Sequence, residues 1–321
     1  MKRIVRRTVL AWPLALAMTA QLTGTAGAQN YPNDTITFVV GFSAGGFADS
    51  VARIMAEHVG SVLGATVIVE NQAGAASNIA ARAVASAEPD GYTVLVSTTS
   101  LAINATMFRN IDYNLMEDLI PVGIAVRAPE TLSVYPGRAA SLEKFMASEG
   151  TYSSAGVGSG SYFTWYSFFE SVDGANVVHV PFQGGAPATQ AAIGGQVDAL
   201  AATASGNTVS NVTSGQLDCL AVAAPERYSK LPDCPTLEEL GYPNHYGSSW
   251  VGFWVPAGTP DDIVETLNEA INSIAENANA AENLMRHGNL AGMNAADTLD
   301  FMQSEVDTWG ERVIATDAQI E

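Results

Sequence analysis

The chain has 321 residues, of which 47% are apolar and 15% charged, and its 33 acidic residues outnumber 14 Lys and Arg, giving a formal net charge of −19. This composition is that of a folded globular protein, and it excludes a disordered chain, a polytopic membrane protein and a mini-protein stapled by disulfides. The negative charge opposes binding to nucleic acid or anionic lipid, since both require basic patches. At roughly 150 residues per domain, the length predicts two domains.

The first 28 residues have the pattern of an export signal. Its basic region contains Lys2, Arg3, Arg6 and Arg7. An apolar stretch follows over 9–18, and the small residues that end at Ala28 form a cleavage site. The apolar stretch is shorter than the roughly 20 residues of a membrane span. The pattern therefore predicts a secreted protein, by either the general or the twin-arginine export route.

Export would place Cys219 and Cys234, the two cysteines of the chain, in an oxidising compartment. A disulfide between them and two separate buried thiols are both compatible with the sequence. The sequence has neither a second cysteine pair nor a histidine cluster at metal-ligand spacing, so we expect no metal site.

Segments typical of strands and helices alternate from Tyr31 onward. The β-branched run over 35–42 predicts a strand, SAGG interrupts it, and apolar residues at helical spacing from Val51 to Val62 predict a helix. The same order recurs as a strand over 65–71, a glycine-led helix over 73–87, and a strand over 92–100 that ends in hydroxyl residues. Such alternation is typical of βαβ units and of a mainly parallel sheet.

The second half of the chain repeats this organisation. After a loop over 110–118, strands are predicted over 119–126 and 131–136, on either side of a polar break at 127–130. The later predicted elements are a glycine loop over 151–161, a helix over 162–171, strands over 176–182, 197–203, 217–224 and 249–256, a helix over 188–195, and a helical tail over 260–321. The chain thus has two similar α/β halves, one of which the C-terminal helices would complete.

The segment GFSAG at 41–45 matches the G-x-S-x-G pattern of the nucleophile elbow in α/β-hydrolases, and it lies between a predicted strand and a predicted helix. An exported serine hydrolase that uses Ser43 is therefore one hypothesis. Against it, Ser43 follows the first strand of the mature chain, so no earlier loop could supply the oxyanion hole. His245 and His287 also lack a well-placed acid before them.

An electrostatic interpretation of the loop from Ser43 to Gly46 is stronger. A helix start leaves N–H groups unpaired, and glycines let an anion approach them without any cationic side chain. GVGSGS at 156–161 repeats this device, and Ser159 and Ser161 add hydroxyl donors. Two facing helix N-termini would clamp a carboxylate, whereas the alternative is that each loop is only a tight turn with an N-cap. GVGSGS lacks the third glycine of a dinucleotide loop, so we expect no nucleotide cofactor.

Polar residues at the ends of the predicted elements are further candidates. Asp49 lies in the first turn of its helix, where it either complements the helix dipole or faces a ligand that carries an ammonium or hydroxyl group. Thr98 and Ser100 end a strand, where open α/β sheets bind ligands, or they are ordinary loop residues. Tyr162 begins the aromatic helix, whose other aromatic residues we expect in the core.

Seven segments in a fixed order carry a family resemblance. They are YPNDTITFVVGFSAGGFADSVAR, VIVENQAGAASNIAA, EPDGYTVL, VVHVPFQGGAPA, GGQVDAL, LPDCPTLEELGYP and SSWVGFWVPAGTP. Each motif is short, but together they span nearly the whole mature chain. The chain resembles the substrate-binding proteins of tripartite tricarboxylate transporters, the TctC or Bug family.

The resemblance implies an α/β fold like that of type II periplasmic binding proteins, with two doubly wound domains, two crossover strands and a ligand cleft between the domains. Domain 1 would comprise 29–127 plus 250–321, and domain 2 would comprise 128–249, after a signal peptide over 1–28. The family implies a monomeric periplasmic receptor that closes like a clamshell on a small carboxylate. It would need no cofactor and would deliver its ligand, without catalysis, to a two-component membrane permease. A ligand-sensing adaptor would share this fold and stays open as an alternative.

The resemblance also implies ligand contacts. They fall at Phe42, Gly45, Gly46, Asp49, Thr98, Ser100, Gly158, Ser161 and Tyr162. The candidate site is completed by Ser43, Ser159, Gln183, Gly184 and Thr203. The chain departs from the family pattern at the SAGG loop, which is usually rich in proline, at Tyr162 for a common His, at Gln183 for a frequent Lys, and at Ala202 and Thr203 where an acidic residue is usual. These departures predict a less charged distal pocket and leave an aromatic or less polar carboxylate open.

Overall fold

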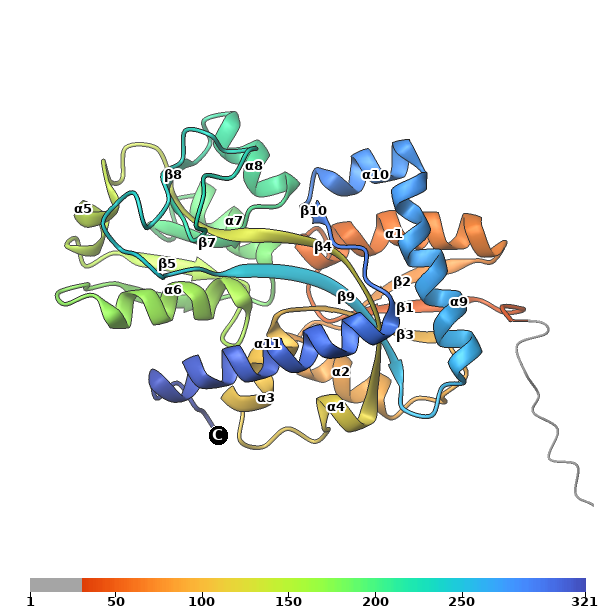
Figure 1. The fold of residues 1–321 in the computed structure, drawn as a ribbon. Coiled ribbons are helices and arrows are strands. Elements are labelled where there is room, and N and C mark those ends of the chain that lie inside the picture. The colour runs from red at the N-terminus through yellow and green to blue at the C-terminus, as the bar shows by residue number, and fades with distance from the viewer. Residues whose placement is uncertain (1–30) are drawn as a thin grey trace, which may run out of the picture.

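The computed structural model describes residues 31–321, and the predicted signal peptide over 1–28 lies outside this range. Its strands are β1 Ile36–Val40, β2 Val67–Asn71, β3 Thr93–Thr98, β4 Leu119–Val134, β5 Thr151–Ser154, β6 Val178–Pro181, β7 Ala199–Thr203, β8 Asp218–Val222, β9 Ser248–Pro256 and β10 Asn289–Leu290. They form one sheet in the order β2-β1-β3-β9-β4-β7-β5-β6, with β8 and β10 also paired to β4. The fold is thus mixed α/β, as the alternating pattern predicted (Figure 1).

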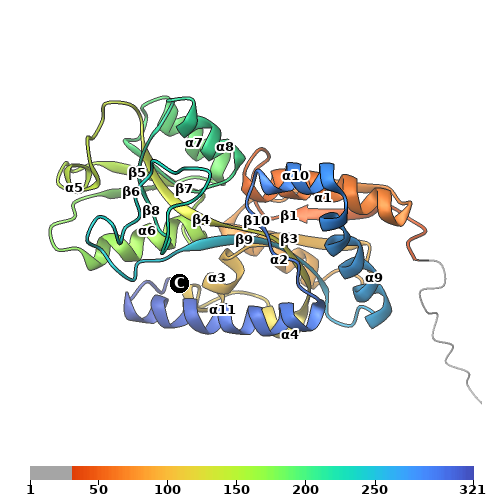
Figure 2. The same ribbon diagram turned by 45° about the horizontal axis from the view of Figure 1, so that its top comes forward.

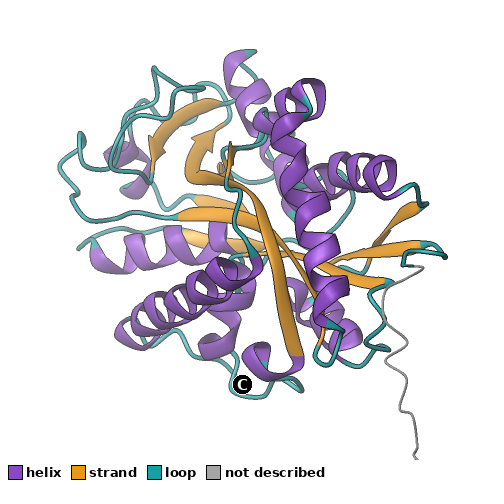
Figure 3. Ribbon diagram, turned by 45° about the vertical axis from the view of Figure 1, so that its right-hand side comes forward, coloured by secondary structure: helices purple, strands orange, loops and turns teal. Residues whose placement is uncertain are grey.

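Helices surround the strands on several sides (Figure 3). They are α1 Phe47–Leu63, α2 Asn78–Ala85, α3 Ser100–Met107, α4 Leu115–Asp118, α5 Leu142–Met146, α6 Gly160–Ser171, α7 Gly185–Ile193, α8 Gly206–Thr213, α9 Asp261–Asn272, α10 Ala278–Met285 and α11 Ala295–Ala315, with the 3₁₀ helices η1 Ala75–Ser77 and η2 Ser273–Glu276. Among the helices of residues 31–321, none has the length and apolar character that a bilayer crossing requires.

The sheet has two parallel flanks joined by an antiparallel centre, and this differs from the mainly parallel sheet that the sequence predicts. In the first flank β1 pairs in parallel with β2 and β3, and in the second flank β5 pairs in parallel with β6 and β7. Between the flanks β4 and β9 run antiparallel to each other, and each is antiparallel to its outer neighbour. The two long strands therefore cross from one flank to the other (Figure 2).

The polar break predicted at 127–130 is absent, because β4 is one continuous strand of 16 residues. Its middle residues keep backbone pairing, with Arg127 opposite Trp250, Pro129 opposite Ser248 and Glu130 opposite Thr203. Backbone pairing does not depend on side-chain polarity, so a polar stretch can continue a strand wherever neighbouring strands are available on both sides.

Helices cover both faces of the first flank. Val51, Met55 and Val59 of α1 pack with Phe38 and with residues of α9 on one face. On the other face, residues of α2, α3 and α11 pack around Trp250 and Trp254 of β9. Because α9 and α11 follow β9 in the chain, the C-terminal helices complete the first flank, as the sequence predicted (Figure 1).

The second flank has its own cores, one of them aromatic. Trp165, Phe168 and Phe169 of α6 pack with Tyr152 and Phe145 in one cluster. The helix is capped by Ser159, whose Oγ accepts a hydrogen bond of 3.1 Å from the N–H of Tyr162. Trp165 and Phe169 are thus core residues, as their helical spacing predicted, whereas Tyr166 of the same helix is only half-buried.

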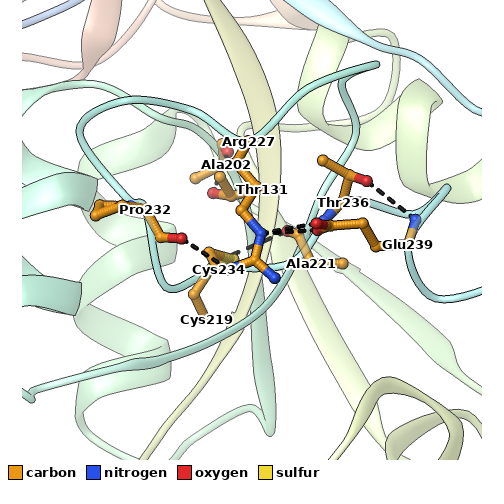
Figure 4. Close-up of a disulfide and its surroundings, with 9 residues drawn as sticks. All are labelled: Thr131, Ala202, Cys219, Ala221, Arg227, Pro232, Cys234, Thr236 and Glu239. Atoms are coloured by element: carbon orange, nitrogen blue, oxygen red, sulfur yellow. Dashed lines mark hydrogen bonds and ion pairs between the residues drawn. A yellow bond between two sulfur atoms is a disulfide. The ribbon is translucent and has the colours of Figure 1, made fainter.

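Of the two alternatives for the cysteines, the structure has the disulfide between Cys219 and Cys234 (Figure 4). It closes a loop that starts on β8 and carries Arg227, which donates hydrogen bonds of 2.9 Å from Nε to both carboxylate oxygens of Glu239. Arg227 also donates to the carbonyl of Pro232 at 2.8 Å. These contacts order the segment between β8 and β9.

Candidate ligand-binding site

A cavity of about 350 Å³ lies between the two flanks, where four helices begin. Its lining comprises Phe42, Gly45, Gly46, Phe47, Ala48, Thr98, Ala155, Ser159, Gly160, Ser161, Gly185, Ala186, Thr189, Gln190, Ala201, Ala202, Thr203, Ser205, Asn207, Thr208, Ser210, Asn211 and Ser249. The first turns of α1, α6, α7 and α8 are all represented, together with the ends of β3, β7 and β9.

The four helix starts leave backbone N–H groups for a ligand. The N-cap residues are Gly46 for α1, Ser159 for α6, Gly184 for α7 and Ser205 for α8, and at α1, α7 and α8 no side chain caps the helix. First-turn N–H groups have no partner within their own helix, and the helix dipole gives them a partial positive charge. Four such ends around one cavity make it a site for an anion.

The lining is polar but uncharged. Among the described residues that line the cavity there is no Asp, Glu, Lys, Arg or His. Hydroxyl and amide side chains supply the remaining polarity, for example Thr98, Ser161 and Asn211. An anion here would therefore be held by N–H groups and hydroxyls, without an ion pair to a cationic side chain.

The first loop contacts the second flank directly beside the cavity. Asn207 Nδ2 donates a hydrogen bond of 2.8 Å to the carbonyl of Gly45, and the N–H of Ser43 donates one of 3.3 Å to the carbonyl of Gln183. A Cβ placed on Gly46 would lie 3.6 Å from the backbone nitrogen of Gly185. The starts of α1, α7 and α8 are thus in contact in this structure.

Half of the sequence-predicted site residues line the cavity, and half do not. Those that do are Phe42, Gly45, Gly46, Thr98, Ser159, Ser161 and Thr203. Those that do not are Ser43, Asp49, Ser100, Gly158, Tyr162, Gln183 and Gly184. The second group lies close to the first along the chain, and its members contact protein groups instead.

Ser43 is packed against Gly184 of the second flank. A Cβ on Gly184 would overlap Ser43 Oγ, and this hydroxyl is buried without a hydrogen-bond partner in the described part of the chain. A serine nucleophile needs a general base within hydrogen-bond reach. His58, His179 and His245 instead lie next to Ser273, Ser154 and Ser171, and His287 lies next to Gly206. Within residues 31–321 the structure therefore places no histidine base on Ser43.

Asp49 does not line the cavity, and its carboxylate contacts protein groups. Its carboxylate accepts hydrogen bonds from the N–H of Gly45 at 2.8 Å, from Arg53 at 2.8 and 3.0 Å, and from Asn71 at 2.9 Å. Burial by itself would raise the pKa of Asp49, but these hydrogen bonds outweigh it and lower the pKa below its ordinary value. The buried carboxylate thus fixes the loop that presents Gly45 and Gly46.

Ser100 and Gly158 lie behind the lining. Ser100 is buried and its Oγ is 3.1 Å from Thr98 Oγ1, so it orients a cavity residue. Gly158 has φ of +89°, and a Cβ there would overlap Asn104 Oδ1 and lie 2.9 Å from Phe108. Gly158 therefore allows the second glycine loop to approach α3 of the first flank closely.

Tyr162 belongs to an aromatic cluster outside the cavity. Its ring lies 5.3 Å from that of Tyr166 and 4.5 Å from that of His179, between ring centroids. Burial raises the pKa of Tyr162 to about 12 and lowers that of His179 to about 4. Both side chains are therefore neutral packing groups near neutral pH, and Gln183 contributes its backbone carbonyl to Ser43 instead of a side chain to the cavity.

The sequence did not reveal the N-terminus of α8 as part of the site. Its segment GNTVSNVT contains Gly, Asn, Thr and Val, which form helices weakly. The available signal was Ser205, a good N-cap residue placed just after β7. The starts of α7 and α8 add Gly185, Ala186, Ser205, Asn207 and Thr208 to the cavity, and Asn211 comes from farther along α8.

Comparison with known proteins gives a consistent result. Residues 51–317 match the family model described as the tripartite tricarboxylate transporter family receptor. The chain is 30% identical to protein BugT of Bordetella pertussis, over 94% of this chain and 95% of BugT. This family consists of receptors that bind solutes, and it is not an enzyme family.

Comparison with solved structures points to the same family. The periplasmic binding protein BugD is 29% identical with a TM-score of 0.85, over 91% of this chain and 100% of BugD. MatC of Rhodopseudomonas palustris, solved with malate, is 30% identical with a TM-score of 0.82, over 88% and 100%. An R. palustris protein solved with adipate is 25% identical with a TM-score of 0.84, over 90% and 99%. The family match and the identity to BugT, together with the similar folds, show that this chain belongs to the TctC/Bug family of solute-binding receptors.

Proposed function

We propose that this protein is a periplasmic receptor that captures a small organic carboxylate, releases it unchanged, and delivers it to a two-component membrane permease of the tripartite tricarboxylate type. The observation that carries the proposal is the convergence of four helix N-termini on one cavity whose lining has no ionisable side chain. Such a site binds an anion by backbone N–H groups. The export signal predicted over 1–28 supports the periplasmic location.

Closure around the ligand would follow from the position of the cavity. We assign 29–127 plus 250–321 to one domain and 128–249 to the other, with β4 and β9 as the connecting strands. Residues from both domains line the cavity, for example Gly46 and Thr98 from one and Ser161 and Asn207 from the other. A ligand that contacts both domains at once stabilises the closed arrangement over any open one.

The ligand contacts that we propose are those of the cavity. From the sequence-predicted set these are Phe42, Gly45, Gly46, Thr98, Ser159, Ser161 and Thr203, and the helix starts add Gly185, Ala186, Asn207 and Thr208. For Asp49, Ser100 and Gly158 we propose supporting roles, because their contacts are to protein groups.

The lining favours a dicarboxylate with a short apolar chain. Relatives have been solved with malate and with adipate, and this cavity adds Phe42, Phe47 and several alanines to its hydroxyl and amide groups. The apolar side chains can contact methylene groups or a ring, while the helix starts hold the carboxylates.

A thermal-shift screen of malate, adipate, citrate and benzoate tests the proposal. A ligand that binds the folded state raises the melting temperature, by an amount that grows with ligand concentration. We expect at least one dicarboxylate to do so at micromolar to millimolar concentration and to be recovered unchanged. If the neutral diamides of the same acids raise the melting temperature equally, the cavity does not select anions and the proposal fails.

Delivery to a permease is tested separately by crosslinking the ligand-loaded protein to membranes of its own host. Capture of the two membrane subunits of a transporter supports delivery. Capture of a sensor kinase instead would indicate the ligand-sensing alternative.

A further inference from the structure

Glu130 is a carboxyl group buried directly behind the cavity wall. It lies on β4 with an exposed fraction of 0%, and its Oε1 accepts a hydrogen bond of 3.1 Å from Oγ1 of Thr203, a cavity residue. A Cβ placed on Gly160, another cavity residue, would lie 3.1 Å from the same Oε1. Glu130 is therefore separated from the cavity by one hydroxyl and one glycine.

The second carboxyl oxygen of Glu130 has no partner. Oε2 is buried without a hydrogen bond in the described part of the chain, although buried polar atoms are usually paired. An unpaired oxygen is far more costly in an ionised carboxylate than in a neutral carboxylic acid. The geometry thus favours the protonated form.

The residues in contact with Glu130 do not offset the effect that burial has on its protonation. Four elements or loops contact it, through Thr203 of β7, Gly160 of α6, Gly247 before β9 and Ala223 after β8. None of these residues has a titratable side chain. The start of α6 favours an ionised carboxylate, but burial dominates and raises the pKa of Glu130 to about 8, while the hydrogen bond from Thr203 lowers it only in part.

We propose that Glu130 is a proton-linked specificity residue, which must be uncharged for an anion to occupy the cavity. This inference rests on the proposed function. An ionised Glu130 would place a like charge just behind a bound carboxylate, in a region of low dielectric where such repulsion is strong. Anion binding and loss of the Glu130 proton therefore oppose each other.

The test compares the wild-type protein with Glu130→Gln, which keeps the shape of the neutral acid, and with Glu88→Gln, which removes a carboxylate at an exposed position. Adipate and malate are titrated by calorimetry near pH 6.5 and near pH 9. Wild type and Glu88→Gln should lose about three- to tenfold in affinity at the higher pH, while Glu130→Gln changes less than about twofold. An equal loss in wild type and Glu130→Gln overturns the inference.

Proton uptake gives a second measurement. Near pH 8, calorimetry in two buffers of different ionisation enthalpy should show that wild type takes up a fraction of a proton with each bound adipate or malate, and that Glu130→Gln takes up none. Uptake that is equal in the two proteins, or absent from wild type, contradicts the inference.

The charge state of Glu130 is also tested without ligand. At neutral pH, infrared spectra of the wild type should show the carbonyl stretch of a protonated carboxyl group that is missing in Glu130→Gln. A spectrum without this difference overturns the inference, whatever ligand the protein binds. Failure of both acids to bind near pH 6.5, with the infrared difference present, would instead count against the proposed ligand class.

Discussion

The side-chain amide of Asn207 donates a hydrogen bond of 2.8 Å to the main-chain carbonyl of Gly45, and so ties the start of α8 to the loop before α1. Because Asn207 also lines the cavity, this bond connects the two sides of the site only when they are close. We expect Asn207→Ala to weaken binding of the carboxylate found in the screen about tenfold, since one hydrogen bond contributes about 0.5–1.5 kcal/mol and the ligand contact is lost with it. Calorimetric titration measures the loss.

Thr213→Ala, at the exposed end of the same helix, is the matched control, because Thr213 does not line the cavity. The Thr213→Ala variant should bind the carboxylate with the same affinity as the wild type. A tenfold loss in the control, or wild-type affinity in Asn207→Ala, would show that the bond to Gly45 has no part in binding.

Gly158 lies in the tight contact between the second glycine loop and α3, and Gly158→Ala should force this contact apart. The backbone strain of a non-glycine residue at φ of +89° should lower the free energy of unfolding by about 1–2 kcal/mol. The added Cβ would also overlap Asn104 Oδ1, so ligand affinity should fall as well if binding requires this contact.

Gly174→Ala separates these two effects. Gly174 has a similar φ of +80°, but a Cβ there would meet no atom within 4 Å. Urea denaturation should show a loss of stability in both variants, with the larger loss in Gly158→Ala because of the overlap, whereas only Gly158→Ala should lose affinity. Equal affinity in both variants would mean that the contact with Asn104 does not affect closure.

Glu130 should make stability depend on pH in an unusual direction for a carboxyl group. Burial raises the pKa of Glu130 to about 8, above its ordinary value of 4.5, so between these pH values the folded chain holds a proton that the unfolded chain has lost. The stabilising contribution of this proton to the folded state is therefore complete below about pH 4.5. It is lost as pH rises toward 8, and the free energy of unfolding then falls by at most about 1.4 kcal/mol per pH unit.

Urea denaturation at several pH values checks this slope. Glu130→Gln should gain stability relative to the wild type as pH rises from about 5 to 8, and the difference should then stay constant. A constant difference over the whole range would mean that Glu130 titrates normally in the folded protein.

The disulfide should stabilise the protein without affecting the site. Cys219 and Cys234 close a loop with a sequence separation of 15, and neither lines the cavity. Replacing both with Ser should lower the free energy of unfolding by about 2–4 kcal/mol, chiefly because the unfolded chain gains freedom. Ligand affinity measured well below the melting temperature should not change, and a large change would link the loop to the site.

Strands β1 and β3 of the first flank were predictable because most of their side chains are apolar and buried on both faces. The continuity of β4 was not predictable from residues 127–130. Its polar residue Glu130 is buried by the strands and helix around it, and that burial is a tertiary effect which local hydropathy does not contain.

The structure of the C-terminal region was likewise only partly predictable from the sequence. A helical tail was predicted over 260–321, and most of it is helical, but Asn289–Leu290 forms the short strand β10 against Val126 and Arg127 of β4. Two residues are too few for a periodic pattern, and their pairing depends on a strand more than 160 positions earlier in the chain.

Within the site, the two glycine loops could be recognised because glycine and serine at a helix start follow from local chemistry. The orientation of each side chain could not. Thr98 lines the cavity while Ser100 turns behind it, and Ser43 packs on Gly184 from a distant part of the chain. Those differences depend on how the flanks meet, which no single segment encodes.

The measurement that tests the central claim most directly is a calorimetric comparison of adipate with its dimethyl ester. The ester keeps the length and the apolar chain of adipate but has no charge for the helix starts to hold. We predict that adipate binds with one site per chain and is recovered intact, and that the ester binds at least a hundredfold more weakly and is not hydrolysed. Equal binding of the two compounds, or conversion of the ester to the acid, would contradict the account.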